Sequence, residues 1–262
     1  MDQPRPLKRF GQNYLIDQNI IRKIIDQFNP AKDDVVIEIG PGTGALTKLL
    51  SEKVNSFSAV EIDKRVVDEL RGRFPNTNFI NADFLKTDID KIVSTDKRIR
   101  FIGNIPYNIT SPIVFKLIEN REKVNDALLM VQLEVARRMT AKEKSEDYGI
   151  LSVLLNYFAS AKLCFKISPN VFYPKPKIHS AIVHLDFNKS VPADVEDRLF
   201  IKTVKACFGN RRKTLKNSLA NSIFAEIDLP AGEFDMSRRA EELTIDDFVH
   251  LAKLIGERTH IR

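Results

Sequence analysis

Short apolar segments alternate with helical segments along the first 188 residues of the chain. Residues 35–39 are typical of the apolar kind, being rich in β-branched side chains, and a helical segment begins soon afterwards at Ala45. Parallel strands need long crossover connections, which are usually helices. The alternation therefore predicts a mostly parallel sheet with helices on both faces, that is, an α/β, Rossmann-like fold.

Seven segments are predicted as strands, and the last two form a closing pair that places one strand antiparallel to the rest. The predicted strands are residues 35–39, 57–62, 78–82, 99–103, 127–132, 159–167 and 179–187. Helices are predicted for residues 18–28, 64–74, 112–120 and 148–157, and from Ala45 to Leu50. Composition changes near residue 188, and the remainder is predicted to be helical. We therefore predict two domains, residues 1–188 and residues 189–262.

Composition narrows the class of protein. Hydrophobic residues make up 43% of the 262, which is enough for a substantial core. Only two cysteines occur, which argues against a disulfide scaffold, and the four histidines show no spacing that indicates a metal site. No apolar run is long enough to span a membrane, and none follows the basic start as in a signal peptide. We therefore expect a cytoplasmic protein without a resident metal.

A glycine-rich motif, Gly40-Pro41-Gly42-Thr43-Gly44, follows the first predicted strand. Its glycines allow a sharp turn and a close approach to a ligand, and the next helix would direct its positive end toward a bound group. Glu61, at the end of the second strand, is placed to accept hydrogen bonds from ribose hydroxyls. Asp83, after the third strand, is placed to accept one from an adenine amine. The pattern predicts a nucleoside cofactor, either S-adenosylmethionine (SAM) or a dinucleotide.

A second motif, Asn104-Ile105-Pro106-Tyr107, follows the strand predicted at residues 99–103. It sets a carboxamide, a backbone carbonyl and a flat aromatic ring side by side. The first two can accept the N–H bonds of an exocyclic amine, and the ring can stack on the base. Together the two motifs predict methylation of an amino group on a nucleobase. On the glycine motif alone a dehydrogenase remains an alternative, although no second nucleotide-binding half follows and no group for hydride chemistry is evident.

These motifs and several others, in this order, resemble the KsgA-type ribosomal RNA adenine dimethyltransferases over almost the whole chain. The matching segments are residues 11–15 (GQNYL), 38–47 (EIGPGTGALT), 61–63 (EID), 81–84 (NADF), 104–109 (NIPYNI) and 171–181 (VFYPKPKIHSA). Residues 208–217 and 239–248 also resemble the C-terminal pattern of the family. The chain has Ile105 where the bacterial form more often has Leu, which we expect to matter little because the backbone carbonyl carries the role.

The resemblance implies a seven-stranded SAM-dependent methyltransferase domain with a small C-terminal helical domain. It implies dimethylation of the N6 amines of two adjacent adenosines, in a hairpin near the 3′ end of 16S rRNA, during small-subunit maturation. Separately from the resemblance, we expect a monomer. The residues predicted to bind or border SAM are Asn13, Leu15, Gly40, Gly42, Glu61, Asp83, Phe84 and Asn104. The predicted catalytic residues are Asn104, Ile105, Pro106, Tyr107 and Phe172, with Phe172 closing the face of the base opposite Tyr107.

The C-terminal part contains a stretch between Arg198 and Ala225 with seven basic residues and no acidic one. This concentration of charge predicts a surface that contacts RNA phosphates. The predicted RNA-binding residues are Arg198, Lys202, Lys205, Arg211, Arg212, Lys213 and Lys216.

Two alternatives remain beside this interpretation. The macrolide-resistance methylases, which modify an adenine of large-subunit (23S) RNA, share the Asn104–Tyr107 motif and the Pro-Lys-Pro-Lys stretch. A non-catalytic ribosome-assembly factor with the same fold would bind RNA without transferring a methyl group. The segments 44–47, 208–217 and 239–248 favour the KsgA type over the first alternative, and the intact motif residues argue against the second.

Overall fold

The computed structural model describes residues 6–7, 11–191, 195–210, 212–227 and 232–259. By its internal contacts the chain divides into two compact units. The first comprises Met1–Ala136 and Ala161–Asn188, and the second comprises Arg137–Ser160 and Lys189–Arg262. The domain boundary predicted after residue 188 stays a prediction, and the structure groups residues 137–160 with the C-terminal residues rather than with those that precede them.

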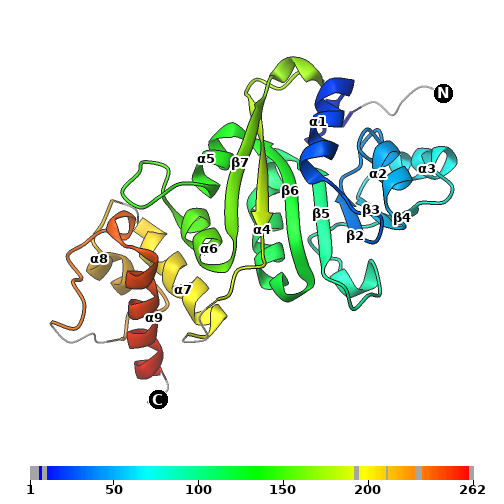
Figure 1. Cartoon of the computed structure of the whole chain (residues 1–262). Helices are drawn as coiled ribbons and strands as arrows, with labels where there is room; N and C mark the ends of the chain where they lie inside the picture. Colours follow the sequence, from blue (N-terminus) through cyan, green and yellow to red (C-terminus); the bar gives the residue numbers. More distant parts are fainter. Residues whose placement is uncertain (1–5, 8–10, 192–194, 211, 228–231, 260–262) are drawn as a thin grey trace. The chain divides into compact units, whose positions relative to one another are not determined.

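The first unit is built around a seven-stranded sheet in the order β4-β3-β2-β5-β6-β9-β7 (Figure 1). Strands β2 to β6 are parallel, and β9 pairs antiparallel with β6. Their bounds are β2 (Val35–Ile39), β3 (Ser56–Glu61), β4 (Asn78–Asn81), β5 (Ile99–Asn104), β6 (Val124–Gln132), β7 (Ser160–Ile167) and β9 (Ser180–Asp186). The predicted seven-stranded α/β fold, with one antiparallel strand, is confirmed.

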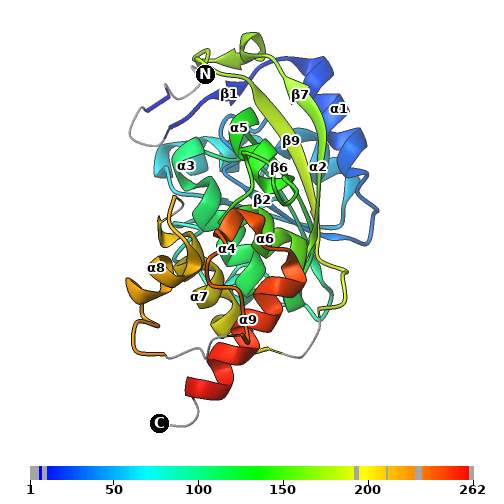
Figure 2. The same cartoon turned by 90° about the vertical axis from the view of Figure 1, so that its left-hand side faces the viewer.

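Helices cover both faces of this sheet (Figures 1 and 2). Apolar residues of α1 and α2 form one core cluster with Ile102 of β5. Because side chains alternate along a strand, the neighbouring Phe101 lies on the opposite face. There its ring meets Phe84 at 5.9 Å between centroids, and Lys116 of α4 lies 5.1 Å from the Phe84 ring. The helices are α1 (Gln18–Phe28), α2 (Thr47–Lys53), α3 (Lys64–Arg73), α4 (Thr110–Glu119) and α5 (Leu133–Met139).

Helix α1 illustrates why the sequence predicts its ends well. Asp17 caps it by accepting hydrogen bonds from the N–H groups of Asn19 (2.8 Å) and Ile20 (3.0 Å). At the other end Asn29 adopts a left-handed conformation with φ of 45°, and Pro30 follows. A polar cap before the helix and a left-handed residue after it therefore fix both ends locally.

The second unit is helical. Its helices are α6 (Ile150–Phe158), α7 (Asp197–Cys207), α8 (Leu215–Ala220) and α9 (Ile245–Thr259). Aromatic rings join them, since Tyr157 of α6 stacks on Phe200 of α7 at 3.9 Å between centroids, and Phe208 stacks on Phe248 of α9 at 5.9 Å. The Tyr148 hydroxyl, which is buried, donates to the Leu243 carbonyl (3.1 Å). No helix in the described part of the chain is long and apolar enough to cross a membrane.

Besides short 3-10 helices, one α-helix and two strands of the structure are absent from the sequence-based prediction. The helix is α5, and the two strands form a small antiparallel sheet, β1 (Tyr14–Leu15) with β8 (Phe172–Tyr173). Strands of two residues are too short to show a periodic pattern, and their pairing joins segments far apart in the sequence. This small sheet ties the N-terminal segment to the segment that precedes β9.

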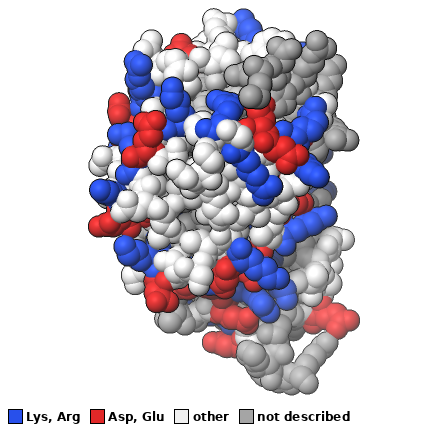
Figure 3. Space-filling model, turned by 90° about the vertical axis from the view of Figure 1, so that its right-hand side faces the viewer, with Lys and Arg blue, Asp and Glu red and all other residues white. Residues whose placement is uncertain are grey.

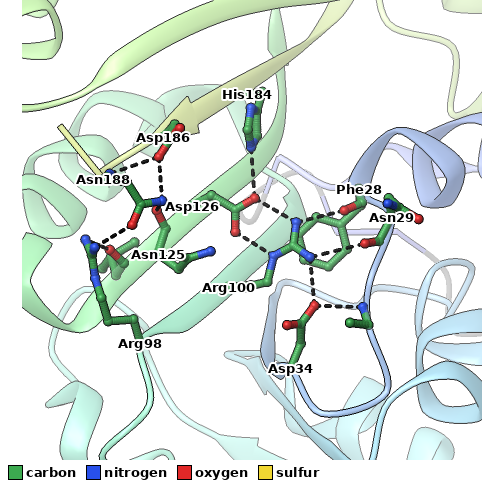
Figure 4. Close-up of polar contacts among 12 residues, drawn as sticks. Phe28, Asn29, Asp34, Arg98, Arg100, Asn125, Asp126, His184, Asp186 and Asn188 are labelled. Carbon is green, nitrogen blue, oxygen red and sulfur yellow. Dashed lines mark hydrogen bonds and ion pairs between the residues drawn. The ribbon is translucent and has the colours of Figure 1, made fainter.

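A polar network around Arg100 joins four segments near the amino ends of the central strands (Figure 4). The guanidinium binds Asp126 of β6 through Nε (2.7 Å) and Nη2 (2.8 Å), and it binds Asp34 through Nη1 (2.7 Å). It also donates to the Phe28 carbonyl at the end of α1 (2.8 Å). His184 of β9 contacts the second Asp126 oxygen at 2.8 Å. Burial raises the pKa of Asp126, but the hydrogen bonds and charges of Arg100 and His184 outweigh burial and lower it.

We predict that Asp126→Ala lowers the free energy of unfolding by about 3–5 kcal/mol, because it leaves the half-buried Arg100 with one carboxylate fewer. Denaturant titration at neutral pH measures the loss. The matched control is Asp90→Ala, which removes the exposed ion pair with Lys123 and should cost about 0–1 kcal/mol. Equal losses in the two variants would contradict the importance of the network.

Candidate active site

A cavity lies at the carboxyl ends of β2, β3 and β5, where both sequence motifs emerge from the sheet. Its lining comes from the N-terminal segment, the glycine-rich loop, the ends of β3 and β4 and the segment after β5. The lining residues predicted from the sequence are Asn13, Leu15, Gly40, Gly42, Glu61, Asp83, Phe84, Asn104, Ile105, Pro106 and Tyr107. The structure thus brings together every predicted cofactor residue and four of the five predicted catalytic residues.

The glycine-rich loop is shaped by its neighbours as well as by its own sequence. Gly42 has a φ of +54°, and a Cβ there would lie 3.1 Å from the Tyr14 ring. Its N–H points to Glu61 Oε2 at 3.4 Å, while the Asp63 N–H donates to Glu61 Oε1 at 2.9 Å. Burial raises the pKa of Glu61 above its ordinary value. The loop and Glu61 therefore form one hydrogen-bonded wall of the cavity, with the carboxyl group available to a polar ligand.

Residues 11–15 form another wall, and their contacts bear on the predicted catalytic amide. The Asn104 side chain donates through Nδ2 to the Asn13 carbonyl at 2.7 Å. This bond fixes the orientation of the amide, so that Oδ1 remains as its acceptor end. Leu15 is buried and pairs with Phe172. The N-terminal segment thus positions a side chain that lies 91 residues further along the chain.

The segment after β5 leaves the sheet at a point of very close strand contact. A Cβ on Gly103 would lie 2.4 Å from the Ile39 carbonyl oxygen of β2, so only glycine fits there. Ile105 is buried, and its N–H donates to the Met130 carbonyl at 3.1 Å. The Tyr107 hydroxyl lies 2.7 Å from Oγ of the buried Ser180 at the start of β9. These contacts fix the segment that carries Asn104 and Tyr107 at the cavity.

Asp83 and Phe84 follow β4 and complete the far end of the cavity. Asp83 Oδ1 accepts a hydrogen bond from the Leu85 N–H at 3.0 Å, which orients the carboxylate. Phe84 is buried and also lines the cavity. A flat apolar side and a carboxylate therefore stand next to each other, as a heteroaromatic ring with an amine would require.

Phe172 does not line the cavity. It is 3% exposed and belongs to the core cluster that also contains Leu15 and residues of α1. The exposed aromatic residue of this strand is its neighbour Tyr173, at 63%. The predicted role of Phe172 on the second face of a base stays a prediction.

Six of the seven predicted RNA-binding residues are described, and all six are exposed in the second unit: Arg198, Lys202, Lys205, Arg212, Lys213 and Lys216. Arg211 lies outside the described residues. On α7 the opposite face is apolar, since Phe200, Val204 and Cys207 are buried. The helix therefore presents its cations to solvent.

Sequence reasoning missed several residues of the cavity, of which Glu38 is the most unusual. It is 2% exposed, lines the cavity and accepts a hydrogen bond from the Thr47 hydroxyl at 2.5 Å. Burial raises its pKa to about 8. The available signal was a lone carboxylate in the otherwise apolar strand 35–39. Gln12 and Tyr14, whose hydroxyl donates to Gln12 Oε1 at 3.0 Å, had no signal beyond their place in a family motif.

The described residues include no group of three or more His, Cys, Asp or Glu side chains able to hold a metal ion. The polar side chains that line the cavity are carboxylates, amides and hydroxyls. They suit a ligand with hydroxyl and amine groups.

We predict that Glu38 makes stability depend on pH. Between pH 4.5, its ordinary pKa, and about 8 the folded protein holds a proton on Glu38 that the unfolded chain has lost. Raising the pH across this window therefore lowers the free energy of unfolding. Glu38→Gln removes this dependence on pH. The melting temperature of the variant minus that of the unsubstituted protein should therefore increase as the pH is raised from 5 to 8. The exposed control Glu52→Gln should show no such trend. A difference in melting temperature between Glu38→Gln and the unsubstituted protein that stays constant with pH would contradict the prediction.

Comparison with known proteins shows which protein family this chain belongs to, which the geometry alone does not. The sequence model for ribosomal RNA adenine dimethylase matches residues 5–257. The ribosomal RNA small subunit methyltransferase A of Francisella tularensis subsp. novicida is 44% identical, over 95% of this chain and 97% of that protein. The protein of the same name from Alkaliphilus oremlandii is 39% identical, over 96% and 92% respectively.

Solved structures agree with the sequence comparison. A dimethyladenosine transferase from Plasmodium falciparum is 26% identical, with a TM-score of 0.74 over 94% of this chain and 98% of that one. The 23S rRNA methyltransferase ErmE is also 26% identical, with a TM-score of 0.66 over 93% of this chain and 100% of that one. Both likenesses extend across nearly the whole chain, as does the family match, and the chain belongs to the ribosomal RNA adenine dimethylase family.

Proposed function

We propose that this protein uses SAM to dimethylate the N6 amines of two adjacent adenosines in 16S rRNA during maturation of the small ribosomal subunit. The observation that carries the proposal is the single cavity shared by the glycine-rich loop and the Asn104–Tyr107 segment. The names of the relatives at 39% and 44% identity support the small subunit as the target. ErmE, named for a 23S rRNA target, is less similar in sequence, which disfavours the large subunit.

The residues of the cavity fit SAM. Glu61 would accept hydrogen bonds from the ribose hydroxyls, and Asp83 would accept one from the adenine amine beside the Phe84 ring. Gly40 and Gly42, both at positive φ, would let the backbone turn closely around the methionine part. Asn13 and Leu15 would cover the cofactor from the N-terminal side. When bound there, SAM supplies a methyl group on a positively charged sulfur, which is open to attack by a nucleophile.

Residues of the chain would compensate for the low nucleophilicity of the adenine N6 amine. The N6 lone pair of adenine is delocalised into the ring, so attack requires the nitrogen to become more tetrahedral. Asn104 Oδ1 and the Ile105 carbonyl would accept the two N–H bonds and favour that geometry. Tyr107 would stack on the base and hold it in place. After the C–N bond forms, the acidic cationic product loses its proton to solvent, so no general base is required beforehand.

The rRNA must present the target base out of its stack, at a cost of about a few kcal/mol. The exposed cations of α7 and of the segment around Lys213 would contribute by contacting phosphates. Among the described residues on the face drawn in Figure 3, by contrast, cationic and anionic side chains are mixed. We also propose that the protein acts in the cytoplasm as a monomer.

The decisive experiment supplies methyl-labelled SAM with unmethylated small subunits, and in parallel with large-subunit RNA. Modified bases are then mapped. The proposal expects label on two adjacent adenosines of the small-subunit RNA. Label confined to large-subunit RNA would overturn it in favour of the ErmE-like alternative, and absence of label from both would favour a non-catalytic assembly factor.

We predict that Asn104→Ala lowers kcat by about 10²- to 10³-fold, because the amide stabilises the attacking nitrogen only as the reaction proceeds. Single-turnover methyl transfer to small subunits measures the effect. Isothermal titration with SAM shows whether the cofactor site survives. The control is Asn55→Ala, an exposed amide at the amino edge of the sheet, which should keep full activity. Full activity of Asn104→Ala would contradict its assigned role.

A further inference from the structure

The loop between β8 and β9 has no part in the chemistry described above. This β8–β9 loop, residues 174–179, has the sequence PKPKIH. Together with the turn that follows β7, it surrounds a shallow hollow in the first unit. The hollow is lined by Ser168, Pro169, Asn170, Lys175, Pro176, Lys177 and His179.

The hollow lies next to the candidate active site. His179, on its rim, immediately precedes Ser180, whose Oγ lies 2.7 Å from the Tyr107 hydroxyl. Consecutive Cα atoms are about 3.8 Å apart, so the rim is one residue from a direct partner of the stacking ring. The Leu133 N–H also donates to the His179 carbonyl at 3.0 Å, which anchors this end of the loop beside the carboxyl end of β6. A nucleotide chain leaving the cavity on this side would meet the loop at once.

The stretch of sequence around the loop carries charge of one sign. No acidic residue occurs from Ala161 to Leu185, whereas Lys175 and Lys177 both lie in the loop. Their side chains are exposed and form no ion pair or hydrogen bond with any described residue. Pro174 and Pro176 restrict the backbone on either side of Lys175, so less conformational entropy would be lost when a partner binds. The loop thus holds two unpartnered cations on a stiff backbone.

An aromatic residue borders the cations. Tyr173, at the end of β8, is 63% exposed, and its backbone is held by pairing with Tyr14. Ile178 in the loop is 42% exposed. Exposed aromatic rings beside cations are the combination by which proteins bind single-stranded nucleic acid, the rings taking bases and the cations taking phosphates.

We propose that the β8–β9 loop and Tyr173 bind the RNA strand that flanks the target adenosine. Lys175 and Lys177 contact its phosphates, and Tyr173 stacks on a neighbouring base. This contact rests on the proposed function, because it concerns the same substrate. It is separate from the cations of the second unit, so the catalytic unit carries an RNA contact of its own.

The test compares two double variants that each remove two positive charges. Lys175→Gln/Lys177→Gln alters the loop. Lys32→Gln/Lys53→Gln alters two exposed lysines at the amino edge of the sheet, where the Asn55 N–H donates to the Lys32 carbonyl at 2.9 Å. Binding of a fluorescent RNA hairpin with two adjacent loop adenosines is measured by anisotropy over a range of KCl concentrations. Methyl transfer to unmethylated small subunits and SAM titration are measured on the same proteins.

The loop variant should reduce the slope of log affinity against log salt by about 1.4, that is, about 0.7 for each lost contact to a single strand. Its KM for small subunits should rise with kcat and SAM affinity unchanged, while the control stays like the unsubstituted protein. Tyr173→Ala should weaken binding about tenfold without changing the slope. An unchanged slope in the loop variant, or an equal reduction in the control, overturns the proposal. Failure of the unsubstituted protein to methylate small subunits would instead contradict the proposed function.

Discussion

The site depends on the pairing of β2 with β5 at the centre of the sheet. From β2 the chain proceeds outward to β3 and β4, then crosses back to β5 on the other side of β2. At such a reversal the loops after the two central strands diverge and leave a crevice at their carboxyl ends. The glycine-rich loop follows β2 and the Asn104–Tyr107 segment follows β5. The two strands approach so closely that a side chain on Gly103 would collide with the Ile39 carbonyl.

The ionisable side chains at the amino and carboxyl edges of the sheet differ in their hydrogen-bond and ion-pair partners. At the amino edge Arg100 is paired with Asp34 and Asp126, so a charge placed inside the protein is matched by hydrogen bonds (Figure 4). At the carboxyl edge burial raises the pKa of both Glu38 and Glu61. Their oxygens accept hydrogen bonds from a hydroxyl and from backbone N–H groups, and no Lys or Arg among the described residues forms an ion pair with them. Such carboxyl groups gain from a ligand that donates hydrogen bonds, which suits a nucleoside with free hydroxyls.

Segments far apart in the sequence support the central crevice. The N-terminal segment pairs with β8 and binds the side chain of Asn104, and β9 supplies Ser180 to Tyr107. The side chains of Asn104 and Tyr107, for which catalytic and stacking roles are proposed, are therefore each oriented by a segment outside the motif that contains them. Because β8 and β9 are joined by the lysine-bearing loop, the same part of the chain that holds Tyr107 also presents the RNA contact proposed here.

The sequence by itself determined the succession of strands and helices along the chain, the ends of elements such as α1, and the two motifs. These are local properties: Asp17 caps its own helix, and a β-branched run followed by glycines favours a strand and a turn. Only the tertiary structure decided that burial raises the pKa of Glu38 at the cavity wall, that Asn13 orients Asn104, and that Phe172 lies in the core beside an exposed Tyr173. Those properties follow from burial and from contacts between distant segments, which strand and helix periodicity does not encode.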